Sequence, residues 1–296
     1  MSTGLATADK PIDVKATVSW PFFAATLLVA ALIILLYGWT LADMAIAWWI
    51  YPNLSQGIMI PPIAAYFAWH DRHKTLALPA APDSRGFTLA LMAAFLFLIG
   101  NLGAEYFLPR ISFVLLLAAL TWMFWGRARL RSLAFPFMLL STMVPLPVLL
   151  YNWAATPLQL LASDAATILA QFFGISVYQD GNVIHLAGMS LGVEEACSGL
   201  SSLSALIVAS LLLGHVYSCR TITRIALLLL SIPIAIAANI FRVTGTAILA
   251  DWHQELAVGF YHTFSGWLVF LAGYGMLVIA TRLTRYILER DHGRIA

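Results

Sequence analysis

The 296-residue chain has few charged residues and almost no cysteine. Only 10% of its residues are charged, 61% are hydrophobic, and the mean hydropathy is +0.86. Soluble globular domains carry about 25% charged residues, so this composition excludes that class and indicates a polytopic membrane protein. The formal net charge of +2 is too small to indicate nucleic-acid binding. The two cysteines, Cys197 and Cys219, provide no disulfide framework.

The sequence also lacks the motifs of several common binding sites. It has no Gly-rich phosphate loop, no Cys/His cluster with metal-ligand spacing and no internal repeat, so we expect no cofactor and no metal. His70 and His73 flank Asp71, but a basic, hydrated loop is a poor place for a metal site. No A-x-A-like cleavage site follows the first apolar run, which we therefore expect to be a retained helix.

Eight apolar runs are candidates for crossing a hydrocarbon core of about 30 Å. They cover residues 20–40, 56–69, 87–103, 111–125, 133–151, 200–217, 222–240 and 262–283. We expect an all-α polytopic membrane protein with eight transmembrane helices. Its parts are an N-terminal tail over 1–19, one integral membrane catalytic domain over 20–283 and a basic C-terminal tail over 284–296.

The basic residues support this count because they gather on one side. With eight spans, fourteen of the sixteen Lys and Arg residues fall on the side of both termini, and only Arg110 and Arg242 fall on the other. The positive-inside rule assigns the larger group to the cytoplasm. The connections over 152–199 and 243–261 then face outward, which places Cys197 outside the cytoplasm.

The outward segment between the fifth and sixth spans is predicted to form a small extracytoplasmic cap. Between 157 and 175 apolar residues recur with helical spacing, and polar residues interrupt them. This pattern predicts an amphipathic helix in the interface rather than a ninth span. Asp180-Gly181 lies between β-prone residues and predicts a hairpin over 177–184.

Cys197 is the first candidate for chemistry. It lies between the acidic pair Glu194-Glu195 and an apolar helix that begins near Leu200. The N-terminus of a helix stabilises the thiolate, which is the nucleophilic form of cysteine. The alternative interpretation is a small, partly buried apolar residue.

Two more groups are expected at the level of Cys197. Asn239 and Arg242 are three residues apart, hence on one helix face, at the outward end of the seventh span, and His262 opens the eighth. An imidazole could deprotonate the thiol, and a guanidinium could stabilise the oxyanion of an acyl intermediate. The alternatives are an Arg242 that snorkels to lipid headgroups or pairs with a Glu, and an ordinary interfacial His262.

The groups that orient these residues are less defined. The supporting candidates are Glu194, Glu195 and Asn239, and the competing bases are His185 and His253. Spacing alone does not choose among them.

Three blocks of the sequence resemble the exosortase/archaeosortase family of membrane cysteine proteases. The blocks are Ala196-Cys197-Ser198-Gly199-Leu200, Pro233 followed by Asn239-x-x-Arg242, and His262-x-x-x-Gly266. Their order and the eight-span layout are also similar to the family. The resemblance implies Cys197 as the nucleophile and Arg242 and His262 as the other catalytic residues. Ser201 stands where members often carry Arg, a departure that bears on substrate preference more than on chemistry.

The resemblance also implies substrates and a location. The substrates would be exported bacterial proteins with a C-terminal sorting signal, made of a Pro-Glu-Pro-like motif, a transmembrane helix and a basic tail. Cleavage would occur at the outer face of the cytoplasmic (inner) membrane, with or without transfer to an acceptor, and members are often tied to exopolysaccharide genes. The partners are then these proteins and the lipid bilayer, with no nucleic acid. The substrate's identity and the oligomeric state stay open.

Two non-catalytic functions compete with this interpretation. A subunit for polysaccharide or lipid export would carry polar residues midway through several spans. Here the spans carry almost no polar residues and the polar groups gather at one face, which disfavours transport. A groove for lipid, however, is itself apolar. A scaffold without any site is the third class, and failure of a thiol-directed probe to label Cys197 selectively at neutral pH would favour it.

Overall fold

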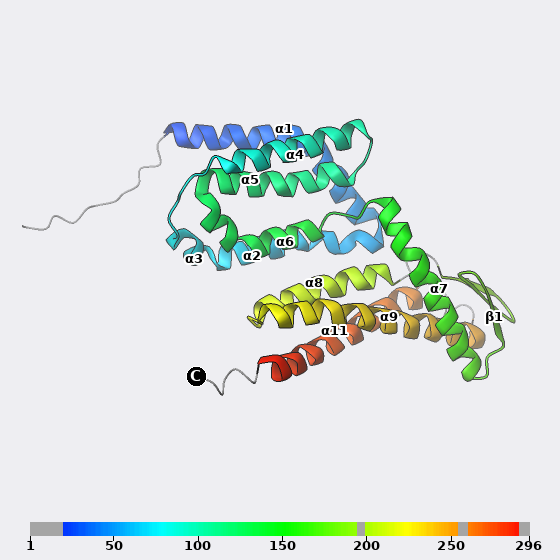
Figure 1. Ribbon diagram of the computed structural model, residues 1–296. Coiled ribbons are helices and arrows are strands. Elements are labelled where there is room, and N and C mark those ends of the chain that lie inside the picture. The colour runs from blue at the N-terminus through cyan, green and yellow to red at the C-terminus, as the bar shows by residue number, and fades with distance from the viewer. Residues whose placement is uncertain (1–19, 194–198, 254–259, 290–296) are drawn as a thin grey trace, which may run out of the picture. The chain divides into compact units, whose positions relative to one another are not determined.

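The computed structural model describes residues 20–193, 199–253 and 260–289 (Figure 1). The chain divides into two compact units, one up to Ala42 and one from Asp43 onward. The helices are α1 (Trp20–Ile50), η1 (Pro52–Ile58), α2 (Ile60–His70), α3 (Arg72–Ala77), α4 (Arg85–Leu102), α5 (Phe107–Ser132), α6 (Ala134–Thr142), α7 (Val148–Phe172), α8 (Leu200–Val216), α9 (Thr221–Trp252) and α11 (Phe260–Glu289). The strands are β1 (Val177–Asp180), β2 (Val183–Leu186) and β3 (Ser190–Gly192). The all-α polytopic class is thus confirmed.

Five helices in the described part of the chain are long and apolar enough to cross a membrane. They are Leu27–Ile50, Arg85–Leu102, Phe107–Ser132, Thr221–Trp252 and Phe264–Leu288. The sixth predicted span corresponds to α8, a shorter apolar helix over Leu200–Val216. The second corresponds to α2, whose 11 residues reach only about 16 Å at 1.5 Å per residue. The count of eight spans, and the topology built on it, stays a prediction.

The predicted fifth span over 133–151 is wrong as one continuous helix. Helix α6 ends at Thr142, and α7 begins only at Val148. Pro145 and Pro147 lie between them, and proline lacks the amide hydrogen that a helix interior requires. Helix α7 also begins before the predicted amphipathic helix, so that Pro157 lies inside it rather than at its start.

Helix α9 is longer than the predicted seventh span, which ended at 240. It continues to Trp252, so Arg242 lies inside the helix and not at its end. No proline follows Pro233 before Trp252, and the hydroxyl groups of Thr244 and Thr246 each donate a hydrogen bond to the carbonyl oxygen four residues earlier, at 2.8 and 2.9 Å. Residues 243–252 of the predicted outward connection over 243–261 are therefore helical.

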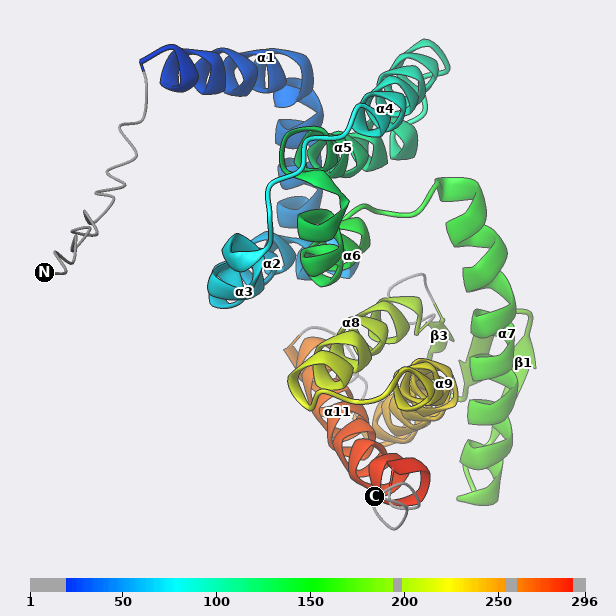
Figure 2. The ribbon, with the colours of Figure 1, turned by 60° about the vertical axis from the view of Figure 1, so that its left-hand side comes forward.

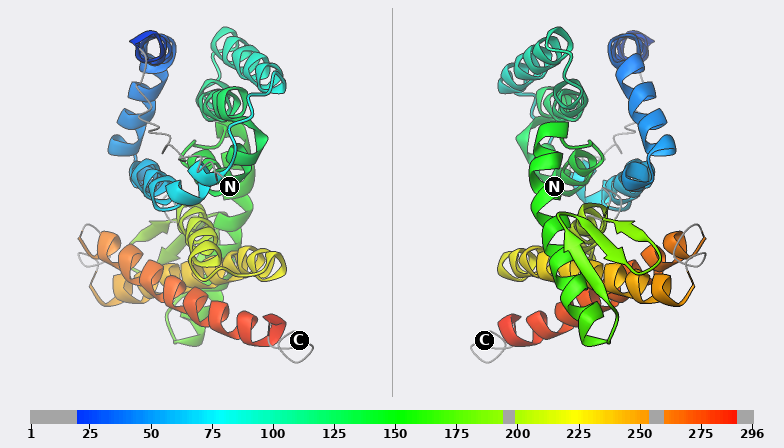
Figure 3. Two further views of the ribbon diagram at one scale, coloured as in Figure 1. Left: turned by 90° about the vertical axis from the view of Figure 1, so that its left-hand side faces the viewer. Right: turned by 90° about the vertical axis from the view of Figure 1, so that its right-hand side faces the viewer.

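A small antiparallel sheet follows α7. The strands are ordered β1-β2-β3, and Tyr178 pairs with His185 across the first hairpin. The predicted hairpin is present, whereas β3 was not predicted. Figure 3 shows the sheet lying against α7, and buried side chains of α7, β2 and α9 form one apolar core there. The position of this cap relative to a membrane stays a prediction.

Helices α8, α9 and α11 pack together, and α7 packs along α9 (Figure 2). Leu206, Leu213, Leu227 and Leu277 are among the buried residues of their shared core. Helix α9 is the element that contacts all three of the other helices, which makes it the centre of this part of the fold.

Polar contacts join the second half of α1 and the following helix η1 to segments that are distant in sequence. Gln56 Nε2 donates a hydrogen bond to Ser204 Oγ on α8 at 2.7 Å. Trp48 Nε1 donates to the Met143 carbonyl oxygen at 3.1 Å. The guanidinium of Arg110, whose side chain is only 10% exposed, lies 2.6 Å from Asp43 Oδ2. Arg110, one of the two predicted outer cations, is thus engaged by a carboxylate.

We expect Asp43→Ala to lower the free energy of unfolding by roughly 1–3 kcal/mol, because it leaves the mostly buried Arg110 guanidinium without its countercharge. Thermal unfolding of the protein in detergent measures the change. Lys74→Ala is the control: Lys74 Nζ lies 2.9 Å from Asp71 and its hydrogen bond lowers the pKa of Asp71, but the Lys74 side chain is 81% exposed. Such surface pairs contribute little. Equal melting temperatures for the two variants would contradict the prediction.

Candidate active site

The structure describes part of the predicted site. Arg242 and Asn239 lie on α9, and His262 lies in the first turn of α11. Cys197, Glu194 and Glu195 lie outside the described residues. The described part of the site consists of α9 and of the glycines of the other two sequence blocks, Gly199 and Gly266.

Asn239 lies on a buried face of α9. Its side chain is 2% exposed, and Ala235 and Val243, one turn on either side, are also buried. Arg242 is three residues further along on the same face and is partly exposed. The predicted pairing of these two residues on one helix face is confirmed, within a helix rather than at its end.

Gly199 brings the start of α8 against Asn239. It precedes the first residue of α8 with a φ of 81°, in the left-handed region. A Cβ atom at Gly199 would lie 2.8 Å from Asn239 Cγ and 2.9 Å from its Nδ2, closer than real Cβ contacts. Both the backbone angle and the lack of space require glycine here.

Gly266, near the start of α11, faces the guanidinium of Arg242. A Cβ atom at Gly266 would lie 3.5 Å from Nη2 and 3.6 Å from Cζ of the guanidinium, an ordinary contact distance. Gly266 is four residues after His262, so the two positions share a face of α11. The face of α11 that carries His262 is thus the one that meets Arg242 a turn later.

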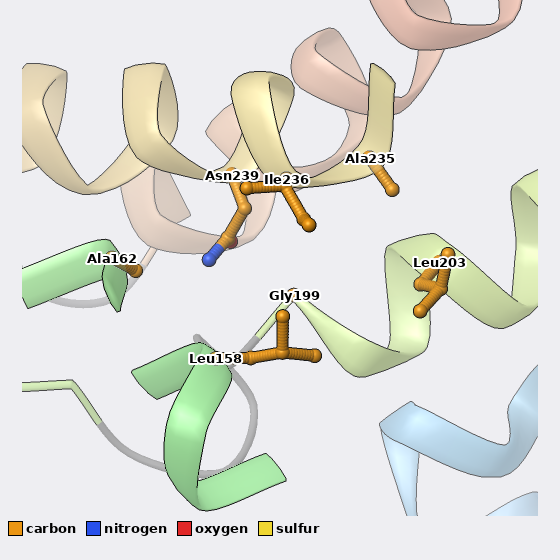
Figure 4. A pocket seen from close by; sticks show the side chains of 7 residues that line it. All are labelled: Leu158, Ala162, Gly199, Leu203, Ala235, Ile236 and Asn239. Carbon is orange, nitrogen blue, oxygen red and sulfur yellow. The ribbon is translucent and has the colours of Figure 1, made fainter. Parts of the chain in front are cut away.

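A small cavity lies beside Asn239, between α7, α8 and α9 (Figure 4). Its volume of about 10 Å³ is close to the space that one water molecule needs. The lining residues are Leu158, Ala162, Gly199, Leu203, Ala235, Ile236 and Asn239. In Figure 4 the amide of Asn239 points from α9 toward the gap between Ala162 and Gly199. The packing next to Gly199 is therefore apolar apart from this amide.

The two competing bases lie elsewhere. His185 is in β2, where its Nδ1 lies 2.8 Å from Ser190 Oγ and its ring stacks on Tyr178 at 4.5 Å. His253 follows the last residue of α9 and is exposed. It is eleven residues beyond Arg242, roughly 16 Å along the helix axis. The choice of His262 over these two histidines stays a prediction.

Sequence reasoning missed the role of the two glycines. It found Gly199 and Gly266 inside the first and third blocks but did not predict which side chains they contact. The sequence feature that could have predicted these positions is a glycine at the start of a helix, Gly199, and a glycine one turn after a candidate base, Gly266. Within the described residues, no three His, Cys, Asp or Glu side chains gather as metal ligands.

A comparison with protein families finds one match across most of the chain. The model of a family described as transmembrane exosortase matches residues 48–279, which is more than three quarters of the 296 residues. The matched range includes all three sequence blocks and helices α2 to α9 in full. No curated protein and no solved structure matches the chain.

Proposed function

The chain belongs to the transmembrane exosortase family, and from this premise we propose that it is a cysteine protease or transpeptidase acting on C-terminal sorting signals. The family consists in general of membrane-embedded sorting transpeptidases, so membrane proteins in a lipid bilayer are the general class of substrate. The proposed signal has a Pro-Glu-Pro-like motif, a transmembrane helix and a basic tail. The proposed site of cleavage is the outer face of the bacterial inner membrane, with both termini of the enzyme in the cytoplasm.

Three residues carry the proposed reaction. His262 takes the proton of the Cys197 thiol, and the thiolate attacks the scissile carbonyl carbon. Arg242 stabilises the negative charge that develops on the carbonyl oxygen. The carbon–nitrogen bond then breaks, the leaving amine takes the proton back from His262, and the substrate is left as a thioester on Cys197. Water or an acceptor amine releases the acyl group.

The observation that carries this proposal is that α9 contacts both of the other sequence blocks. Asn239 packs against Gly199, two residues after Cys197, and the Arg242 guanidinium faces Gly266, four residues after His262, with room for a methyl group between them. Two residues of chain span at most about 7 Å, so the Gly199 contact limits how far the nucleophile can lie from α9. Two segments that are distant in sequence thus approach one turn of α9, which itself carries the second block.

The length of α9 supports an outer position for Arg242. With 32 residues the helix is about 48 Å long, more than a hydrocarbon core of about 30 Å requires. Arg242 lies about 31 Å from Thr221 along the axis, which is one core thickness from the predicted cytoplasmic end. A substrate whose basic tail stays inside would present its cleavage motif at this level, and the glutamate of that motif could also approach Arg242.

Co-expression with a tagged sorting-signal protein tests the proposal. We expect the tagged substrate to be shortened, with a new C-terminus just outside its transmembrane helix, and a thioester on Cys197 to be trapped by acid quenching. Mass spectrometry reads both products. A substrate that keeps its original terminus, with no acyl group on Cys197, would contradict the proposed reaction.

A further inference from the structure

The packing of Asn239 against Gly199 leaves no space for a side chain at position 199. Gly199 has no room for a methyl group, since a Cβ atom would lie within 3.0 Å of three atoms of the Asn239 side chain. Gly266, by contrast, has room for a methyl group beside the Arg242 guanidinium. The two motif glycines therefore differ, and only Gly199 is held against α9 with no free space.

Both sides of this contact are fixed by their surroundings. Asn239 is 2% exposed on a helix that packs against α7, α8 and α11. Gly199 makes the left-handed turn into α8, and its carbonyl oxygen accepts the hydrogen bond of the Leu203 N–H at 2.8 Å. A shift of Gly199 would therefore move the first turn of α8 or displace the Asn239 amide.

We propose that Asn239 is a positioning residue for the nucleophile and acts through Gly199. The proposal rests on the proposed function, because it assumes that Cys197, two residues before Gly199, attacks the substrate. Arg242 is three residues beyond Asn239, about 4.5 Å along the axis. Gly199, two residues from the proposed nucleophile, therefore packs against α9 within one turn of Arg242, the proposed oxyanion group. A packed helix is the kind of rigid support that catalytic geometry needs.

Loss of the Asn239 amide gives the segment room to move. The neighbouring cavity has a volume of about 10 Å³ and shares Asn239 and Gly199 in its lining. The Asn239→Ala substitution removes the amide and enlarges this cavity, so Gly199 can shift toward α9. A displacement of about 1 Å lowers the catalytic rate about 100-fold while substrate binding persists.

The experiment uses the full chain, purified in detergent, in a Cys219→Ala background so that Cys197 is its one thiol. The variants are Asn239→Ala, Gly199→Ala and the double variant. Gly174→Ala is the matched control. Gly174 has a φ of 83° but open space around it, so this substitution introduces the same backbone strain as Gly199→Ala without a steric clash. The readouts are kcat and KM for a synthetic sorting-signal peptide, and the pH of half-maximal alkylation of Cys197 by iodoacetamide.

We expect Asn239→Ala and Gly199→Ala each to lower kcat about 100-fold with KM changed less than about 3-fold, and to raise the pH of half-maximal alkylation. Gly174→Ala should leave both readouts unchanged. The two losses should not multiply in the double variant, because residues in contact are not energetically independent. A smaller amount of folded protein would also lower the apparent kcat at an unchanged KM. We therefore express kcat per folded enzyme, and the shifted pH of alkylation is the readout specific to positioning.

Two results would overturn the positioning role: an Asn239→Ala variant with the wild-type kcat and alkylation curve, or losses that multiply in the double variant. Failure of the proposed function looks different, because the unsubstituted enzyme would then cleave no peptide. The alkylation curves still decide the positioning role in that case, since they need no substrate.

Discussion

The Cys197→Ala variant is expected to accumulate to the wild-type level and to leave a co-expressed sorting-signal substrate uncut. Removing the sulfur removes the atom that forms the acyl intermediate, so the cleavage rate should fall by about 10⁴-fold or more. An immunoblot of the tagged substrate measures the ratio of cut to uncut protein. Alanine is small and well tolerated before a helix start, so the variant should fold.

Cys219→Ala is the matched control for this experiment. Cys219 is 3% exposed and lies in the apolar core of α8, α9 and α11, beyond the end of α8 opposite to Gly199. Its substitution removes one buried sulfur from the core and leaves the active-site end of α8 unchanged, so cleavage should persist. Normal processing by Cys197→Ala would end the proposal. A loss in both variants would point to folding instead of chemistry.

The sequence predicted the helices better than their ends. Apolar runs predicted α4, α5, α8, α9 and α11, because a helix in lipid must be apolar over its whole length. The same criterion failed at the boundaries of α9, where the hydropathy falls after Ile240 but the backbone continues in the same hydrogen-bonding pattern to Trp252. Hydropathy reports the position of the lipid, whereas a helix ends where its backbone bonding stops.

At the prolines the sequence predicted one continuous helix where the structure has two. The run over 133–151 is apolar throughout, yet Pro145 and Pro147 divide it into α6 and α7. Pro157 was expected at a helix start and instead lies inside α7, without ending the helix. A proline removes one hydrogen bond, and whether the helix ends or continues depends on the packing around it.

The site shows a similar division. The i, i+3 spacing was sufficient to predict that Asn239 and Arg242 share a face of α9. It could not predict that Asn239 meets Gly199 or that Arg242 meets Gly266, because helix periodicity does not specify which helices are neighbours. The two glycines belong to the blocks that resemble the family, and the structure shows which residues of α9 lie beside each of them.

His262→Ala is expected to lower kcat for cleavage by about 100- to 10,000-fold, the range for loss of a general base. It should also raise the pH at which Cys197 reacts with iodoacetamide. A neighbouring imidazole, or the imidazolium of an ion pair, favours the thiolate, so its removal raises the thiol pKa and shifts half-maximal labelling to higher pH. The alkylation curve separates this role from loss of the fold, since an unfolded chain would expose the buried Cys219 to labelling as well.

His185→Ala and His253→Ala are the controls, because both were competing bases in the sequence. His185 contacts Ser190 and Tyr178 in the sheet, and His253 is exposed beyond the end of α9. Both variants should cleave at the wild-type rate with an unshifted alkylation curve. If His253→Ala or His185→Ala abolished cleavage while His262→Ala did not, the base would have to come from another segment. The contact of Gly266 with Arg242 would then have only a packing role.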